Sequence, residues 1–187
     1  MAIKSKAAAV VLGAVCLFGL ALRARSADET LATASVKFAD ARWAAPNFVG
    51  ISNWLNSAPL SISGLRGKVV LVDFWTYGCY NCVNTLPYVT RLYQEFRDKG
   101  LVVVGVHTPE FPFEKSTTNV RAALQRHGIT YPVAQDNDYA TWNAYRNQYW
   151  PAQYIVDQNG NVVYVHAGEG QYKEIEQTIQ KLLNVSG

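Results

Sequence analysis

Apolar and polar positions along the chain form blocks that predict strands and helices in turn. Residues 69–75, VVLVDFW, and residues 101–106, LVVVGV, are apolar and rich in valine, which is typical of strands covered on both faces. Between them, residues 79–98 carry apolar side chains at steps of three and four, which predicts an amphipathic helix with a kink at Pro87. A strand, a helix and a second strand in this order predict a parallel strand pair.

The second half of the chain predicts an antiparallel hairpin and shorter elements. Residues 154–156 and 162–165 are apolar runs joined by DQNG at residues 157–160, which is typical of a hairpin turn. The other expected elements are helices over residues 120–127 and 140–145, a strand over residues 132–134, and an amphipathic helix that ends near Leu183. Together the elements predict a small α/β fold with a mixed sheet and helices on both faces.

The first 26 residues have the composition of a targeting segment. Lys4 and Lys6 precede an apolar stretch over residues 7–22, which is short for a membrane span of about 20 residues. Small residues before Ala27 permit cleavage there, but the arginines that follow the apolar stretch keep an uncleaved membrane anchor as an alternative. The expected organisation is a signal peptide or anchor over 1–26, a linker or N-terminal extension over 27–45, and a folded domain over 46–187.

Charge and cysteine content narrow the function classes. Four of the 17 basic residues precede position 27, which leaves 13 against 14 acidic ones in the remaining chain. That part is near neutral and has no basic stripe, so nucleic acid is not an expected partner. Two of the three cysteines, Cys79 and Cys82, lie outside the apolar leader. If the leader exports the chain, the compartment permits a disulfide between them.

The two cysteines follow a predicted buried strand and begin the predicted helix. Unpaired N–H groups and the partial positive charge at a helix N-terminus favour a thiolate over a thiol. We therefore expect Cys79 to have a lowered pKa and to act as nucleophile. Cys82 lies one helical turn further on, where it can resolve a mixed disulfide.

Asp73 is the one charged residue of the strand VVLVDFW. A carboxylate is costly to bury without a partner, so one interpretation is a residue at the strand end that reaches solvent or a backbone donor. The other is a buried acid with a raised pKa that accepts the proton of Cys82. We favour the second interpretation because the strand ends at the cysteine motif.

The strand VVLVDFW followed by CYNC resembles thioredoxin, in which Asp-Phe-Trp precedes the Cys-x-x-Cys at the same spacing. The wider sequence is similar to the exported TlpA/ResA-like branch of the thioredoxin-like superfamily and to the periplasmic module of DipZ-type proteins. This resemblance implies a thioredoxin-like fold with an N-terminal strand extension and a TlpA-type insertion over residues 107–138. The matching stretches are WLNSAPLSISGLRGKVVLVDFWTYGCYNCVNTLPYV, VVGVHTPEFPFEK, ITYPVAQDNDYATWNAYRNQYWPAQYIVDQNGNV and HAGEGQYKEIE.

The resemblance also implies a set of site residues. Pro151 takes the place of the cis-proline that faces the dithiol in thioredoxin, and Trp150 replaces a threonine there, which implies a bulkier substrate surface. We expect Tyr77, Tyr80 and Asn81 to complete that surface. The glycine-rich segment at residues 168–170 is either a simple turn before the last helix or a loop near the dithiol, and we favour the turn. No metal or cofactor is expected.

The resemblance implies an exported thiol-disulfide oxidoreductase in the periplasm or another extracytoplasmic compartment. It implies work in the reducing direction on protein disulfides, with cytochrome c maturation as one setting and a membrane electron donor of the CcdA/DsbD type. A disulfide-forming oxidase would use the same cysteine pair, because Tyr80 and Asn81 do not fix the redox potential.

Three other functions compete with disulfide exchange. Thr76 and Cys79 form the Thr-x-x-Cys pattern of peroxiredoxin-like peroxidases, but the proline that usually precedes the threonine is missing. A structural zinc site needs four ligands, and one cysteine pair with three scattered histidines does not supply a recognisable set. A binding protein without enzymatic activity would use the many aromatic side chains as a recognition groove.

Overall fold

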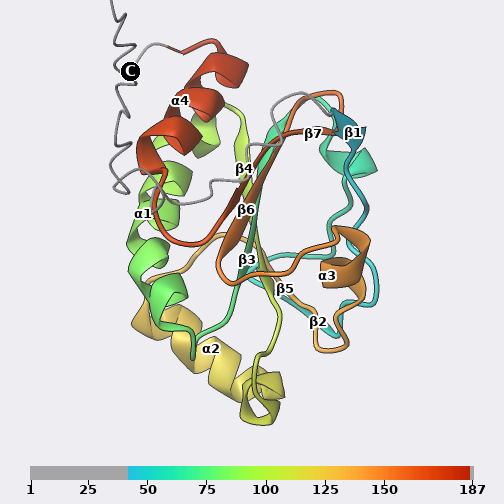
Figure 1. The fold of residues 1–187 in the computed structure, drawn as a ribbon, viewed down its shortest axis with the longest axis vertical. Helices are drawn as coiled ribbons and strands as arrows, with labels where there is room; N and C mark the ends of the chain where they lie inside the picture. Colours follow the sequence, from blue (N-terminus) through green and yellow to red (C-terminus); the bar gives the residue numbers. More distant parts are fainter. Residues whose placement is uncertain (1–41, 186–187) are drawn as a thin grey trace, which may run out of the picture. The chain divides into compact units, whose positions relative to one another are not determined.

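A seven-stranded mixed sheet organises residues 42–185, the part of the chain that the computed structural model describes (Figure 1). The strands follow the order β1-β7-β6-β3-β4-β5-β2. At the centre, β3 (Val69–Trp75) and β4 (Leu101–His107) run parallel, with Val69 opposite Leu101 and Trp75 opposite His107. The predicted parallel pair is therefore confirmed, and it forms the middle of the sheet.

The antiparallel part of the sheet lies on the other side of β3. Strand β6 (Ala152–Val156) pairs with β3, and β7 (Asn161–Ala167) pairs with β6, which confirms the predicted hairpin. Beyond β4, the short strand β5 (Val133–Gln135) adds a further parallel pair. The sheet is therefore mixed, as expected.

Two short strands close the edges of the sheet. Strand β1 (Trp43–Ala44) pairs antiparallel with β7, inside the region expected to be a linker or N-terminal extension. Strand β2 (Asn53–Leu55) pairs antiparallel with β5 and is not anticipated by the apolar pattern. The chain segment before the central strand thus adds one strand to each edge.

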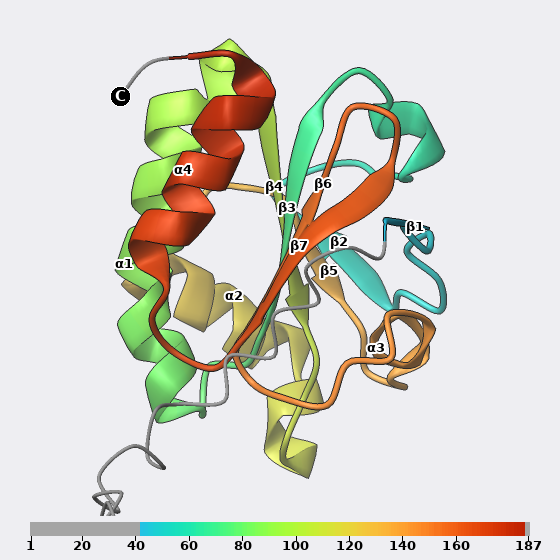
Figure 2. The ribbon, with the colours of Figure 1, turned by 45° about the horizontal axis from the view of Figure 1, so that its top comes forward.

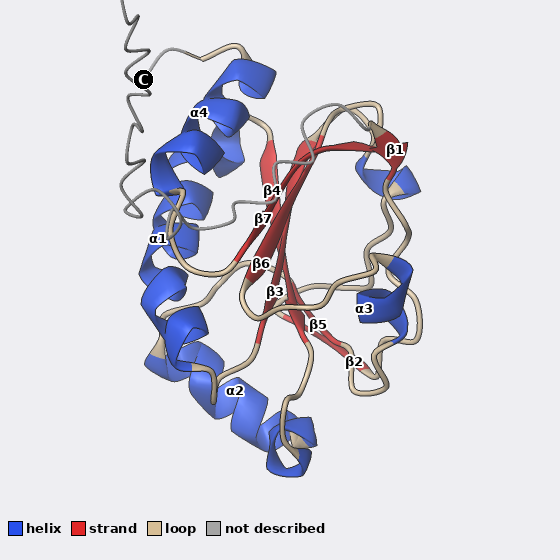
Figure 3. Cartoon of the chain, viewed as in Figure 1, coloured by secondary structure: helices blue, strands red, loops and turns tan. Residues whose placement is uncertain are grey.

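Helices cover both faces of the sheet, as predicted (Figures 1 and 2). Helices α1 (Tyr80–Phe96), α2 (Thr117–Arg126) and α4 (Tyr172–Leu183) pack on one face, and α3 (Ala140–Ala144) on the other. Helix α1 runs on to Phe96 with Pro87 inside it. Figure 3 also shows the short 3-10 segments, which span Ser63–Leu65, Arg97–Lys99 and Pro112–Lys115.

The central strand β3 explains the two-layered core. Its side chains alternate between the faces, so Leu71 and Trp75 join the core beneath α1 while Val72 and Phe74 join the core beneath α3. Every residue of β3 is buried. Because both faces of β3 are covered, the chain can reach the surface only beyond the ends of the strand. The cysteine motif lies shortly beyond the end at Trp75.

The predicted leader over residues 1–26 and the first part of the linker lie outside the described residues. Within residues 42–185, no helix has both the length and the apolar character needed to cross a membrane. The choice between a signal peptide and an anchor remains a prediction.

The β6–β7 turn depends on Asp157, which is buried. Its carboxylate accepts the N–H groups of Asn159 and Asn161 at 3.0 and 2.9 Å. We expect Asp157→Ala to lower the free energy of unfolding by roughly 1–2 kcal/mol, because two partly buried N–H groups lose their acceptor. Urea unfolding measures this change. The matched control is Asp98→Ala, since Asp98 is exposed; an equal effect in both variants would contradict the role of the turn.

Candidate active site

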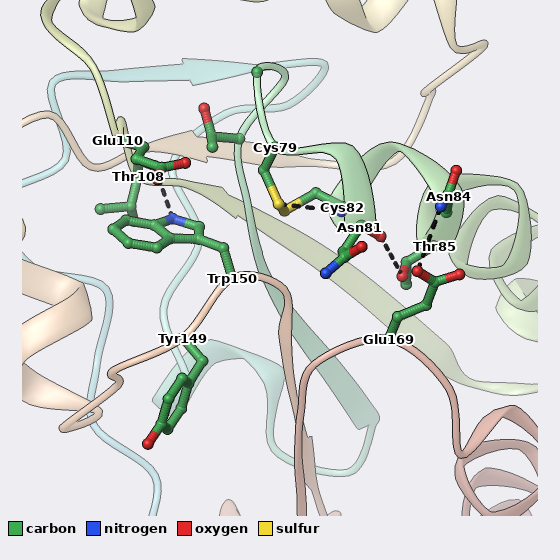
Figure 4. Close-up of a disulfide and its surroundings, with 12 residues drawn as sticks. Cys79, Asn81, Cys82, Asn84, Thr85, Thr108, Glu110, Tyr149, Trp150 and Glu169 are labelled. Atoms are coloured by element: carbon green, nitrogen blue, oxygen red, sulfur yellow. Dashed lines mark hydrogen bonds between the residues drawn. A yellow bond between two sulfur atoms is a disulfide. The ribbon is translucent and has the colours of Figure 1, made fainter.

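Cys79 and Cys82 form a disulfide at the start of α1, with their Cα atoms 5.2 Å apart (Figure 4). Cys79 is the N-cap of the helix, and its sulfur accepts the backbone N–H of Cys82 at 3.2 Å. The free N–H groups at this helix end stabilise negative charge on the Cys79 sulfur once the disulfide is reduced.

The two sulfur-bearing residues differ in their access to solvent. Cys79 is partly exposed, whereas Cys82 is buried and joins the core between α1 and the sheet. An incoming disulfide therefore meets Cys79 first. Cys82 is placed to react only with a sulfur already attached to Cys79.

Asp73 is 1% exposed and lies on the side of β3 that faces α1, with Leu71 and Trp75. Burial raises the pKa of its carboxyl to about 7, against an ordinary value of 3.8, and a hydrogen bond partly offsets this shift. The donor is Nε2 of Gln153, 2.8 Å from Asp73 Oδ1 and directly opposite on β6. Near neutral pH this carboxyl can therefore both accept and release a proton.

The surroundings of Asp73 contain polar atoms without partners. Trp75 Nε1, the Tyr131 hydroxyl and Gln153 Oε1 are buried and accept or donate no hydrogen bond within residues 42–185. Gly105 lies opposite Asp73 on β4, and a Cβ there would come within 3.0 Å of Trp75 Nε1 and 3.1 Å of the Tyr131 ring. Burial and the charge of Asp73 also raise the pKa of Tyr131 well above its ordinary value. Asp73 thus belongs to a small buried group of polar side chains.

The loop before β6 carries Pro151, and the Trp150–Pro151 peptide bond is cis, as the resemblance implies. The Pro151 carbonyl accepts the N–H of Gly168 at 2.8 Å. The indole of Trp150 donates to the Thr108 carbonyl at 3.0 Å and packs against Trp142 with the ring centroids 4.1 Å apart. Figure 4 shows Trp150 on one side of the disulfide and Glu169 on the other.

The glycine-rich segment at residues 168–170 is joined to the dithiol helix. Asn84 of α1 donates to Glu169 Oε2 at 3.4 Å. The segment therefore lies beside the first turns of α1, and the interpretation as a loop near the dithiol agrees with this contact.

The residues expected to bind substrate lie around the motif but differ in exposure. Tyr80 is 79% exposed and Asn81 is also exposed. Tyr77 is half-buried: its ring stacks on His107 with centroids 5.6 Å apart, and its hydroxyl donates to the Phe113 carbonyl at 3.0 Å. Tyr77 thus fixes its neighbours, while Tyr80 and Asn81 are open to a partner.

Glu114 is a site residue to which the sequence pattern assigns no role. Its side chain is fully buried, and its carboxylate accepts the backbone N–H groups of Gly78 at 2.9 Å, Glu110 at 2.6 Å and Phe111 at 2.9 Å. A Cβ at Gly78 would clash with Glu114 Oε1. The insertion is therefore fastened to the residue that precedes Cys79, and that position has no room for a side chain.

Thr76 does not present its hydroxyl to solvent. It is fully buried, and its Oγ1 lies 3.2 Å from Nε2 of His107. Burial lowers the pKa of His107 to about 4, although the charge of Glu114 opposes this shift, so the histidine is neutral at physiological pH. In a peroxidase the Thr76 hydroxyl would contact the peroxide, whereas here it contacts the neutral His107.

Comparison with known proteins places this geometry in a family. The model of the Redoxin family matches residues 41–182. Protein DipZ of Mycobacterium tuberculosis is 50% identical over 143 residues, which cover 75% of this chain and 21% of DipZ. The match therefore spans about a fifth of DipZ. Thiol-disulfide oxidoreductase YkuV of Bacillus subtilis is 29% identical over 138 residues, which cover 74% of this chain and 93% of YkuV.

The fold agrees with these relatives. The solution structure of a thioredoxin-like protein in its oxidised form superimposes with a TM-score of 0.70 at 29% identity. The match covers 78% of this chain and 98% of that protein. With a Cys-x-x-Cys disulfide at the start of α1, the chain belongs to the Redoxin family and has a thioredoxin-like fold.

Proposed function

We propose that the protein is an exported reductase of protein disulfides, with Cys79 as nucleophile and Cys82 as resolving cysteine. The observation that carries this proposal is the layering of the site. Cys79 is partly exposed, Cys82 is buried beneath it, and Asp73 lies on the strand face below with a pKa near 7. This order matches the order of two successive exchange steps.

In the first step, the Cys79 thiolate attacks one sulfur of the substrate disulfide. A mixed disulfide forms, and the other substrate sulfur leaves as a thiolate. In the second step, Cys82 passes its proton to Asp73 and attacks the Cys79 sulfur. The Cys79–Cys82 disulfide forms, the bond between Cys79 and the substrate breaks, and the second substrate sulfur leaves as a thiolate. The substrate gains two electrons, and the enzyme ends in the oxidised form.

The buried carboxylate of Glu114 supports the reducing direction. It accepts the N–H of Gly78, the residue before Cys79, and so places a carboxylate beside the cysteine motif. Negative charge there destabilises the thiolate relative to the disulfide. A dithiol with a less stable reduced form is a stronger reductant. The resemblance to the TlpA/ResA-like branch favours the same direction.

The proposed setting follows from the apolar leader and from the similarity to DipZ. Residues 1–26 would direct the chain out of the cytoplasm, and a membrane electron donor of the CcdA/DsbD type would reduce the disulfide again. Cytochrome c maturation is the proposed pathway. A disulfide-forming oxidase is the second candidate, because it would use the same two cysteines in the opposite direction.

A redox titration against dithiothreitol or glutathione decides between reductase and oxidase. We expect a potential near the thioredoxin end, about −270 mV, and not near the DsbA end, about −120 mV. Glu114→Gln should raise the potential by roughly 30 mV, because the negative charge beside Cys79 is lost. Asp98→Asn is the control, since Asp98 is exposed. A wild-type potential close to −120 mV would overturn the reductase.

Cysteine variants test the order of the two steps. Cys79→Ser should abolish insulin reduction, whereas Cys82→Ser should accumulate mixed disulfides that non-reducing gels reveal. The reason is that only Cys79 is accessible to a substrate, while Cys82 is buried. Insulin reduction by the Cys79→Ser variant would contradict this mechanism. Rapid peroxide turnover in Cys82→Ser would favour the peroxidase.

Asp73→Asn should separate activity from stability. The resolving step should slow by roughly tenfold to hundredfold, because Cys82 loses its proton acceptor. The fold should gain stability above pH 7 by roughly 2–4 kcal/mol, because the variant avoids burying a carboxylate.

The pH dependence of stability follows from the same shift. Between about pH 4 and pH 7 the unfolded chain has released the Asp73 proton while the folded chain keeps it. The free energy of unfolding therefore falls as pH rises through this window, and the loss is complete above pH 7. Urea unfolding at pH 5 and pH 9 measures it, and an unchanged pH dependence in Asp73→Asn would contradict the assignment.

A further inference from the structure

The exposed aromatic side chains lie on segments that border the dithiol. Tyr80 follows Cys79, Tyr149 precedes Trp150, and two phenylalanines lie on the segment fastened to Gly78. One further exposed apolar residue, Val49, lies elsewhere, on the segment before β2. Within residues 42–185, the exposed large apolar side chains are Val49 (43%), Tyr80 (79%), Phe111 (47%), Phe113 (59%) and Tyr149 (57%). Aromatic side chains gathered in the open mark an interaction surface.

The segment that carries the two phenylalanines is held by side chains from three other parts of the chain and by Glu114, which directly follows it. Its carbonyl groups accept hydrogen bonds from Trp150, Tyr139 and Tyr77, and two of its N–H groups donate to Glu114. The rings of Phe111 and Phe113 stack, with centroids 5.7 Å apart and planes inclined by 3°. Because the backbone is already fixed, a partner that covers these rings loses little conformational entropy on binding.

The stacked pair lies close to the reactive cysteine. The Phe113 ring is 6.2 Å from the Tyr77 ring between centroids. Its Cζ atom would lie 4.0 Å from a Cβ at Gly78, the residue before Cys79. A polypeptide whose disulfide reaches Cys79 can therefore place a neighbouring side chain on the pair.

The charge around the dithiol is negative. The four segments that border it contain Glu110 and Glu169, both exposed, and no lysine or arginine; they are residues 77–81, 108–113, 149–151 and 168–170. Figure 4 shows the Glu110 and Glu169 side chains on either side of the disulfide. Such a rim attracts a cationic partner and repels an anionic membrane surface.

We propose that Phe111, Phe113 and Glu110 form a docking surface for a disulfide-bearing polypeptide. Its ligand is an extended segment with an aromatic or long aliphatic side chain near the cysteine and a lysine or arginine beside that side chain. The apolar side chain covers the stacked rings, and the cation pairs with Glu110. This inference rests on the proposed function, because it names the substrate class of the same dithiol.

Binding of a cysteine-free peptide tests the surface apart from the chemistry. The probe is a fluorescein-labelled nonapeptide with serine in place of cysteine, one phenylalanine and one lysine, and fluorescence anisotropy measures its Kd with the oxidised protein. We expect the double variant Phe111→Ser, Phe113→Ser to weaken binding at least tenfold. Val49→Ser is the matched control, because it removes an apolar side chain of similar exposure outside the rim.

A second binding experiment tests the preference for a positively charged peptide. Replacing the peptide lysine by glutamate should weaken binding to the wild type about fivefold at low salt, and Glu110→Gln should abolish the difference. Equal affinity of both peptides for the wild type would overturn the charge assignment. Unchanged binding in the phenylalanine variant, or an equal loss in Val49→Ser, would overturn the docking surface.

A kinetic arm separates docking from reactivity. The same peptide with its disulfide restored is compared with hydroxyethyl disulfide, which is too small to reach the rings and Cys79 together. The phenylalanine variant should lose about tenfold in kcat/KM on the peptide relative to the small disulfide. Equal losses on both would place the rings in support of the dithiol and overturn the proposal. A wild type that binds the peptide but reduces neither disulfide would refute the proposed function and leave the binding result standing.

Two other partners for this surface, a membrane and a second copy of the chain, are tested directly. Flotation with phosphatidylcholine–phosphatidylglycerol vesicles that depends on Phe111 and Phe113 would overturn the proposal in favour of a membrane surface. A dimer in analytical ultracentrifugation that the double variant dissociates would overturn it in favour of a second copy. A monomer that does not float, and still binds the lysine peptide, supports the polypeptide partner.

Discussion

Complete burial of β3 is the constraint on which the site depends. The strand is covered by α1 on one face and by α3 on the other, so the carboxyl of Asp73 is buried and its pKa rises to about 7. The same strand ends at Trp75, shortly before Cys79, which caps helix α1. Burial of this one strand therefore determines where the cysteine motif lies and raises the pKa of the Asp73 carboxyl.

The elements that frame the site could be predicted from the sequence because their signals are local. The runs at β3 and β4 are apolar throughout, and the period of α1 follows directly, so the parallel pair and the position of the cysteines both emerge from neighbouring residues. Asp73 stands out for the same reason, as a charge among apolar side chains. Pro151 was placed by resemblance and has the expected cis bond.

Features formed between distant segments could not be predicted in this way. Glu114 accepts hydrogen bonds from backbone N–H groups. Because every residue except proline has such a group, no sequence pattern predicts its partners. Strand β2 pairs with β5, about 80 residues further along the chain, and its three residues are too few to show a period. Helix α2 begins at Thr117, three residues before its first buried apolar side chain, because Ser116 caps a polar first turn.

The absence of a side chain at Gly78 has a consequence for how this redox centre can change. The position is closed from inside by the Glu114 carboxylate, so variation just before the nucleophile would disturb the insertion as well as the dithiol. Tyr80 and Asn81 point outward and carry no such restriction. Gly78 is thus constrained by the fold. Substitutions at Tyr80 and Asn81 can change the redox potential while the rest of the domain stays unchanged.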